Sequence, residues 1–175
     1  MITTNVSRYL ALAALCFGLA GTARAADGMV GEDGRIAVSA EVVAGALSKL
    51  GYAVDWHTDK GGEPHLVVVN TPDAVKELAV FFDDCGSAGC EDMTFYASFA
   101  NAAGGSLEKL NAWNHIGNKL RSKAFRSGDW QSPDGEVGIS LTLSFQNNSD
   151  GEAIARTAGL FVVEAHMFAA TLAEK

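Results

Sequence analysis

One segment of the chain alternates between apolar residues and small or polar residues with a strict period of two. The apolar positions are Val137, Ile139, Leu141, Leu143 and Phe145, and the positions between them are Gly138, Ser140, Thr142 and Ser144. Because successive side chains of a β-strand point to opposite faces, this pattern predicts a strand with one packed and one solvated face. Such one-sided burial is typical of an antiparallel sheet, since the strands of a parallel sheet are covered on both faces.

The rest of the chain supplies more strands and a smaller number of helices. Further strands are predicted over 52–56, 65–70, 77–84, 92–100 and 121–127, and helices over 39–50, 106–118 and 152–172. The turn residues Asp59-Lys60-Gly61-Gly62 join the first two strands as a hairpin. The resulting order, αββββαββα, predicts an α+β fold in which the helices pack on one face of an antiparallel sheet.

The last predicted helix has an unusually wide apolar stripe. One line of the stripe consists of Ile154, Ala158, Phe161, Ala165, Phe168 and Leu172, and Leu160, Val163 and Met167 widen it. The resulting stripe is too wide for an isolated surface helix. We therefore expect this helix to pack in the core and also to offer a surface for another copy of the chain or for another protein.

Residues 1–25 have the layout of a secretory signal peptide. A polar start that carries Arg8 is followed by an apolar run over 9–19, and a small-x-small triplet ends at Ala25. The apolar run is too short to cross a bilayer as a permanent helix. We predict cleavage between Ala25 and Ala26, and a periplasmic or secreted location.

The predicted mature chain is strongly acidic. Removal of Arg8 and Arg24 leaves 11 basic residues against 21 acidic ones, a net charge of −10. Such a surface repels phosphate backbones and anionic headgroups, so we expect neither a nucleic-acid partner nor stable membrane insertion. We assign a flexible leader to 26–36 and a single domain to 37–175.

Cys85 and Cys90 are the cysteines that remain once the signal peptide is removed. An oxidising compartment favours their pairing, and the intervening Gly-Ser-Ala-Gly can turn tightly between two strands. A structural disulfide is therefore our prediction. A redox dithiol is the first alternative, although such pairs usually sit two residues apart at a helix N-terminus and away from acidic neighbours. A metal site is the second, although a closed zinc site needs four ligands.

Three other sets of residues are candidates for chemistry. Ser106 and Lys109 match the Ser-x-x-Lys motif of penicillin-binding enzymes, but the Ser-Asp-Asn and Lys-Thr-Gly partner motifs are absent from the sequence and Ser106 also suits a helix N-cap. The four histidines do not form a His-Glu-x-x-His or a close His-x-His pattern of the kind that binds a metal: His57, His65, His115 and His166. The carboxylates beside the hairpin turns, which are Asp55, Asp59, Asp83, Asp84, Glu91 and Asp92, lack calcium-loop spacing and are expected to be solvated. We therefore predict no metal and no cofactor.

The region from Cys85 to Ser127 resembles the YbjN-domain family. A Cys-x4-Cys turn is followed by the aromatic strand MTFYASF, a glycine loop and a helix with the motif Ser-Leu-x-x-(Leu/Ile)-Asn-x-Trp-Asn. The motif falls on Ser106, Leu107, Leu110, Asn111, Trp113 and Asn114, whereas residues 115–136 depart from the family pattern. The resemblance implies a sensory-transduction regulator without established catalytic residues, with an α+β fold shared with secretion-chaperone-like domains.

Asn111, Trp113 and Asn114 are the candidate binding or fold-specifying residues of this motif. Leu110 and Trp113 lie three positions apart on one helical face and are expected to bury against the sheet. The two asparagines either bond a neighbouring turn or line a recognition groove.

We expect a non-enzymatic periplasmic module that acts by protein–protein interaction or as a chaperone-like protein, with another protein or a second copy as its partner. A sheet face or the last helix would be its working surface. The alternative, from a different class, is a small extracytoplasmic enzyme with thiol–disulfide or acyl-transfer chemistry at Cys85 and Cys90 or at Ser106.

Overall fold

The computed structural model describes residues 38–71, 74–86, 89–100, 104–115, 121–127, 135–144 and 151–174. The predicted signal peptide, its cleavage site at Ala25 and Ala26, and the leader over 26–36 lie outside the described residues.

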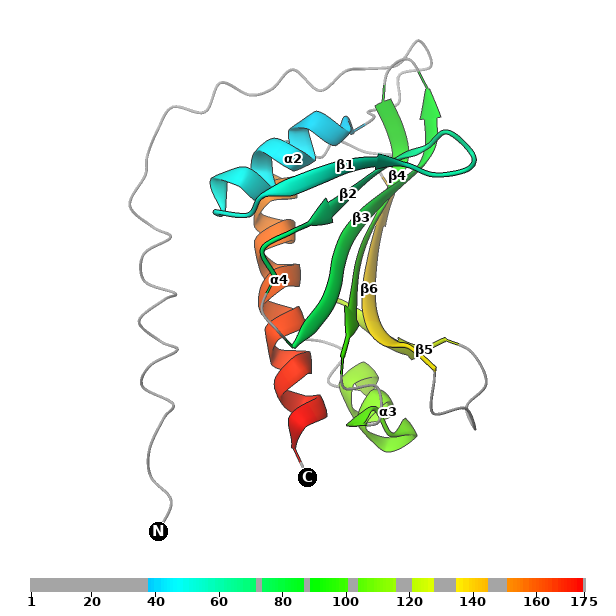
Figure 1. The fold of residues 1–175 in the computed structure, drawn as a ribbon, viewed down its shortest axis with the longest axis vertical. Coiled ribbons are helices and arrows are strands. Elements are labelled where there is room, and N and C mark those ends of the chain that lie inside the picture. The colour runs from blue at the N-terminus through cyan, green and yellow to red at the C-terminus, as the bar shows by residue number, and fades with distance from the viewer. Residues whose placement is uncertain are drawn as a thin grey trace.

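The described chain forms a six-stranded antiparallel sheet with helices α2, α3 and α4 (Figure 1). Its elements are α2 (Ala40–Lys49), β1 (Val54–Thr58), β2 (Pro64–Val68), β3 (Val75–Gly86), β4 (Gly89–Phe99), α3 (Leu107–His115), β5 (Lys123–Arg126), β6 (Val137–Ser144) and α4 (Gly151–Ala173). The strands are ordered β1-β2-β3-β4-β6-β5 across the sheet. The predicted α+β class and the predicted order of elements are both confirmed.

One hydrophobic core lies between the sheet and the helices. Figure 1 shows α2 and α4 side by side along the same side of the sheet, with α3 near the C-terminal end of α4. Phe95 of β4 packs on Phe161 of α4 with ring centroids 5.4 Å apart. Phe168 of α4 meets Trp113 of α3 at 4.9 Å, so the three helices and the central strands share one core.

Local signals in the sequence explain where α2 begins and ends. The Ser39 hydroxyl accepts a hydrogen bond from the Val42 backbone N–H, as an N-cap does. After α2, Gly51 adopts a φ of 88°, a left-handed conformation that glycine tolerates best and that stops a helix.

The apolar stripe of α4 divides into a buried and an exposed part. The predicted first line, from Ile154 to Leu172, is buried, whereas Leu160, Val163 and Met167 are 42–53% exposed. Glu164 lies in the buried part and is 6% exposed. Among the described residues, the helical stretch Glu152–Ala173 is long and apolar enough to cross a membrane, judged by length and composition alone. In this structure the helix packs against the sheet.

The second face of the sheet differs from the prediction in one place. The alternating pattern predicts that the face carrying Gly138 is solvated, yet Gly138 and its cross-strand neighbour Ser98 are both buried. A Cβ atom at Gly138 would lie 2.7 Å from the Phe125 ring, because this ring on the edge strand β5 lies across β6. The glycine therefore admits an aromatic ring that the alternating pattern does not predict.

Candidate functional site

Side chains on the face of the sheet opposite the helices form the candidate site, which we call the helix-free face. The register places Phe81 of β3 opposite Thr94 of β4, and Tyr96 of β4 opposite Ser140 of β6. Alternation sends the neighbouring Val80 and Phe95 into the core. Figure 1 shows α2 and α4 along the other side of the sheet.

Five aromatic rings cross the helix-free face from one edge of the sheet to the other. We call this set the aromatic belt, and it consists of His57 (β1), His65 (β2), Phe81 (β3), Tyr96 (β4) and Phe125 (β5). The successive centroid distances are 5.2, 5.4, 5.9 and 5.8 Å. Cross-strand neighbours of this kind stabilise a sheet. The rings of the belt are exposed or half-buried, so the belt is also open to a partner.

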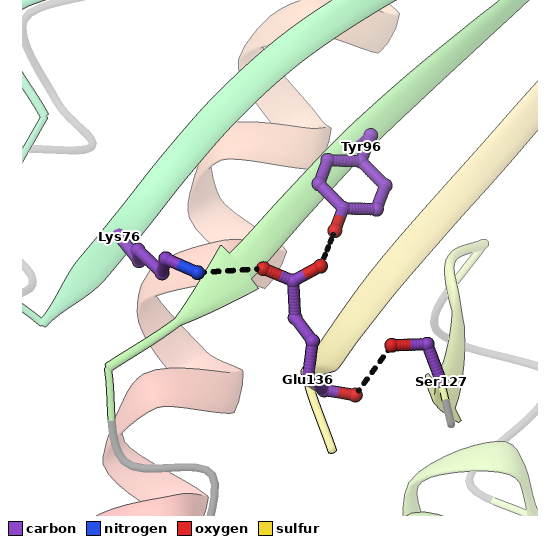
Figure 2. A network of polar contacts seen from close by, with 4 residues as sticks. All are labelled: Lys76, Tyr96, Ser127 and Glu136. Carbon is purple, nitrogen blue, oxygen red and sulfur yellow. Dashed lines mark hydrogen bonds and ion pairs between the residues drawn. The ribbon is translucent and has the colours of Figure 1, made fainter. Parts of the chain in front are cut away.

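A polar network adjoins the belt at Tyr96 (Figure 2). The Tyr96 hydroxyl donates a 2.6 Å hydrogen bond to Glu136 Oε2, and Lys76 Nζ donates a 3.1 Å bond to Glu136 Oε1. The Ser127 backbone N–H donates to the Glu136 carbonyl at 2.8 Å and holds the acidic residue just before β6. Tyr96, Glu136 and Lys76 thus come from three separate segments and converge on one carboxylate.

A β-bulge turns Lys76 toward this network. Val75 pairs with Phe99 and Glu77 pairs with Ser98, so Lys76 is an extra residue between the two pairs. A bulge of this type re-aims the side chain of the inserted residue. Val75 is buried and the Lys76 side chain is 61% exposed, with its amine on Glu136.

The network moves the pKa values of its two acidic groups further from neutral pH. Burial, followed by the hydrogen bond to Glu136, raises the pKa of Tyr96 well above its ordinary value of 10.0. The hydrogen bond from Tyr96 lowers the pKa of Glu136 below 4.5, the bonds from Lys76 add to this effect, and burial opposes it. At neutral pH, Tyr96 is therefore a neutral donor and Glu136 a charged acceptor.

The two cysteines lie together at the tip of the β3–β4 hairpin. Cys85 and Cys90 are cross-strand partners, and their sulfur atoms form a disulfide with an S–S distance of 2.07 Å. Val38, directly before the N-cap of α2, exchanges two backbone hydrogen bonds with Cys90, at 3.0 and 2.9 Å. The hairpin tip is therefore tied to the start of the first described helix.

The asparagines of the Asn-x-Trp-Asn motif have different environments. Asn114 bonds both backbone groups of Ala124 on the edge strand β5, donating to its carbonyl at 3.0 Å and accepting from its N–H at 2.8 Å. Trp113 is 3% exposed and packs on Phe168. Asn111 is exposed on the outer side of α3. In this structure Trp113 and Asn114 hold α3 against the core and the sheet edge.

The Ser-x-x-Lys pair does not form a nucleophile–base arrangement. Ser106 Oγ accepts a hydrogen bond from the Lys109 backbone N–H, as a helix cap does. Lys109 Nζ donates instead to the carbonyls of Thr171 and Glu174 at the end of α4, at 2.9 and 2.6 Å. Lys109 thus satisfies C-terminal carbonyls of another helix. Among the described residues, no group of three or more His, Cys, Asp or Glu side chains is placed to hold a metal ion.

Sequence reasoning missed Glu164, Glu136 and Lys76. The Glu164 carboxylate accepts the backbone N–H groups of Arg121 and Ser122, at 3.0 and 2.8 Å, just before β5. The sequence does contain a signal for this contact, because a glutamate inside an apolar helical stripe needs hydrogen-bond donors nearby. Glu136 and Lys76 had no such signal, because a bulge and a long-range contact bring them together.

The chain matches a protein-family model over residues 39–174. The family is YbjN, described as "Putative bacterial sensory transduction regulator". No curated protein matches the chain. A solved structure titled "Crystal structure of YbjN, a putative transcription regulator from E. coli" is 17% identical, and the alignment covers 79% of this chain and 90% of that chain with a TM-score of 0.48. Because the family model spans most of the sequence, including all the described helices and strands, the chain belongs to the YbjN family.

Proposed function

We propose that this protein is a non-enzymatic regulatory module that binds a partner protein through the helix-free face of its sheet. The aromatic belt next to the Tyr96–Glu136–Lys76 network carries this proposal. The belt supplies apolar ring edges, and the network supplies a fixed carboxylate and an exposed amine. Protein interfaces combine aromatic anchors with a polar, hydrogen-bonding rim in this way.

A protein partner fits this face better than a polyanion does. The chain has a formal net charge of −8, which repels nucleic acids and anionic membranes. The family description as a sensory-transduction regulator agrees with a binding role. The raised pKa of Tyr96 and the lowered pKa of Glu136 also favour a static hydrogen-bonding platform over a catalytic pair.

Photocrosslinking in intact cells tests which face binds. Benzoylphenylalanine replaces Phe81 in the aromatic belt in one variant and Leu160 on the outer side of α4 in a matched variant. Irradiation should give an adduct of defined mass from position 81 and none from position 160. An adduct from position 160 alone, or no adduct from position 81, would contradict the assignment of the helix-free face.

We also propose that the protein works outside the cytoplasm, in the periplasm or as a secreted protein. This proposal depends on the signal-peptide layout of residues 1–25 and agrees with a disulfide between Cys85 and Cys90. Mass spectrometry of the cell fractions should find a periplasmic or secreted chain that begins at Ala26. A cytoplasmic chain that retains residues 1–25 would refute it.

A further inference from the structure

Strand β1 is an edge of the sheet with backbone groups directed away from it. The Asp59 N–H donates to the Glu63 carbonyl, and the Val69 N–H donates to the Ala53 carbonyl. Hydrogen-bonded and non-hydrogen-bonded pairs alternate along an antiparallel ladder. The register of β1 and β2 then directs the N–H and C=O groups of Val54, Trp56 and Thr58 outward from the sheet. An edge of this kind is a template for another strand.

The side chains of β1 are unusually accessible for a strand. Every residue of β1 after Val54 is exposed, and the Trp56 side chain is 49% exposed. Trp56 points to the helix side of the sheet, because it lies opposite the buried Leu66 of β2. Tryptophan is the side chain most enriched among interface hot spots. An exposed tryptophan at the centre of an open edge strand therefore marks a contact surface.

The sequence of β1 is complementary to itself in antiparallel pairing. When two copies of Val54–Thr58 pair around Trp56, each Asp55 lies opposite the His57 of the other copy, and each Val54 lies opposite the other Thr58. Both Asp–His pairs lie on the helix-free face, and the two Trp56 rings meet on the helix side. A two-fold axis through Trp56 generates all of these contacts at once, as an isologous interface requires.

We propose that β1 pairs with β1 of a second copy of this chain, in antiparallel register centred on Trp56. The Asp55–His57 complementarity selects a second copy over an unrelated extended peptide, because the same short strand supplies both members of each pair. The opposite edge of the sheet is less open, since the Asn114 side chain occupies both backbone groups of Ala124 on β5.

Pairing of this kind joins two sheets into one and makes the two helix-free faces continuous. The aromatic belt of each copy begins with His57 on β1, so the two belts meet at the dimer axis. The proposal stands independently of the proposed function, because it depends on pairing along the edge strand β1 and not on a partner protein bound to the helix-free face.

The mass of the protein in solution tests the proposal. The protein is purified after expression of its full coding sequence, and its sedimentation is followed from about 1 to 500 µM. We expect a monomer–dimer equilibrium. Trp56→Pro removes an outward N–H that β2 does not use, and should weaken the dimer about 10- to 100-fold, since two intermolecular hydrogen bonds are lost per dimer.

A charge exchange tests the register. Asp55→Lys and His57→Asp should each weaken the dimer about 3- to 30-fold. The double variant should return to within about threefold of the original affinity, because the new lysine of each copy then faces the new aspartate of the other copy. Asp83→Lys is the matched control: it makes the same change of charge on an exposed residue of β3, two strands from the edge, and should leave the dimer unchanged.

Amide hydrogen exchange provides a readout that needs no variant. In the dimer the Trp56 N–H is bonded, so its exchange should slow as the protein concentration rises, whereas the His57 N–H, already paired with β2, should not change. A monomer at every concentration, or a dimer insensitive to Trp56→Pro, would overturn the proposal. A double variant as weak as the single variants, or a Trp56 N–H that exchanges independently of concentration, would also overturn it.

Discussion

Replacing Asn114 tests how much the two hydrogen bonds between α3 and the edge strand β5 contribute to the stability of the fold. In the native protein the Asn114 amide satisfies both the N–H and the C=O of Ala124, which is 7% exposed. In Asn114→Ala, both backbone groups lose their partner while remaining largely shielded from water. An unsatisfied buried polar group costs about 1–3 kcal/mol, so two of them should lower the free energy of unfolding by about 2–4 kcal/mol, allowing for partial rehydration.

Asn111 is the matched control for this measurement. It is the same residue type on the same helix, three positions earlier, and it is exposed. Asn111→Ala should change the free energy of unfolding by less than about 0.5 kcal/mol. Asn114→Asp adds a second comparison: a carboxylate still accepts from the Ala124 N–H but repels the Ala124 carbonyl, so it should also destabilise the protein.

Urea unfolding with the disulfide intact is the assay for all three variants. The slope of the unfolding free energy against urea should stay constant, so that midpoints report stability. Exchange of the Ala124 amide hydrogen should accelerate in Asn114→Ala more than exchange in β3 does. A loss of unfolding free energy in Asn114→Ala no larger than that in Asn111→Ala would refute this role of the Asn114 side chain.

Three further predictions concern stability and pH. Glu164→Ala leaves two backbone N–H groups without an acceptor and should cost about 2–4 kcal/mol in urea unfolding; a loss below about 0.5 kcal/mol would contradict the role of the carboxylate. Gly138→Ala places a Cβ 2.7 Å from both the Ala97 carbonyl oxygen and the Phe125 ring, and should cost about 1–3 kcal/mol in the same assay; an unchanged or higher midpoint would contradict the close packing at this position. Because the folded pKa of Glu136 is lowered, its contribution to stability is present above pH 4.5 and is lost as the pH falls through the lowered pKa. Tyr96→Phe should flatten this acid dependence in urea unfolding measured at a series of pH values, and an unaltered profile would contradict the hydrogen bond as its cause.

The fold could be predicted because local patterns encode it. The alternation in β6 and the cap at Ser39 report local backbone geometry, and the predicted strands and helices follow from such signals. The buried line of α4 was equally visible, since it repeats at helical spacing.

The candidate site could be predicted only in part, because long-range contacts build it. Tyr96 could be placed on the second face of its strand, but nothing in the sequence shows that Glu136 lies 2.6 Å from its hydroxyl. The bulge that re-aims Lys76 has no glycine to mark it. A buried carboxylate at Glu164 is unexpected in an apolar stripe, and its backbone partners lie more than 40 residues earlier in the chain, where the sequence gives no sign of the contact.

The most direct test of the binding account is to observe which face of the sheet becomes occupied in an extract of the cell. Isotope-labelled protein is followed by NMR in buffer and in a periplasmic extract, with resonances assigned on both surfaces. We expect changes at Thr94, Tyr96 and Thr142 on the helix-free face, and unchanged signals from Val163 and Met167 on α4. Changes confined to α4, or no change on the helix-free face, would contradict the account.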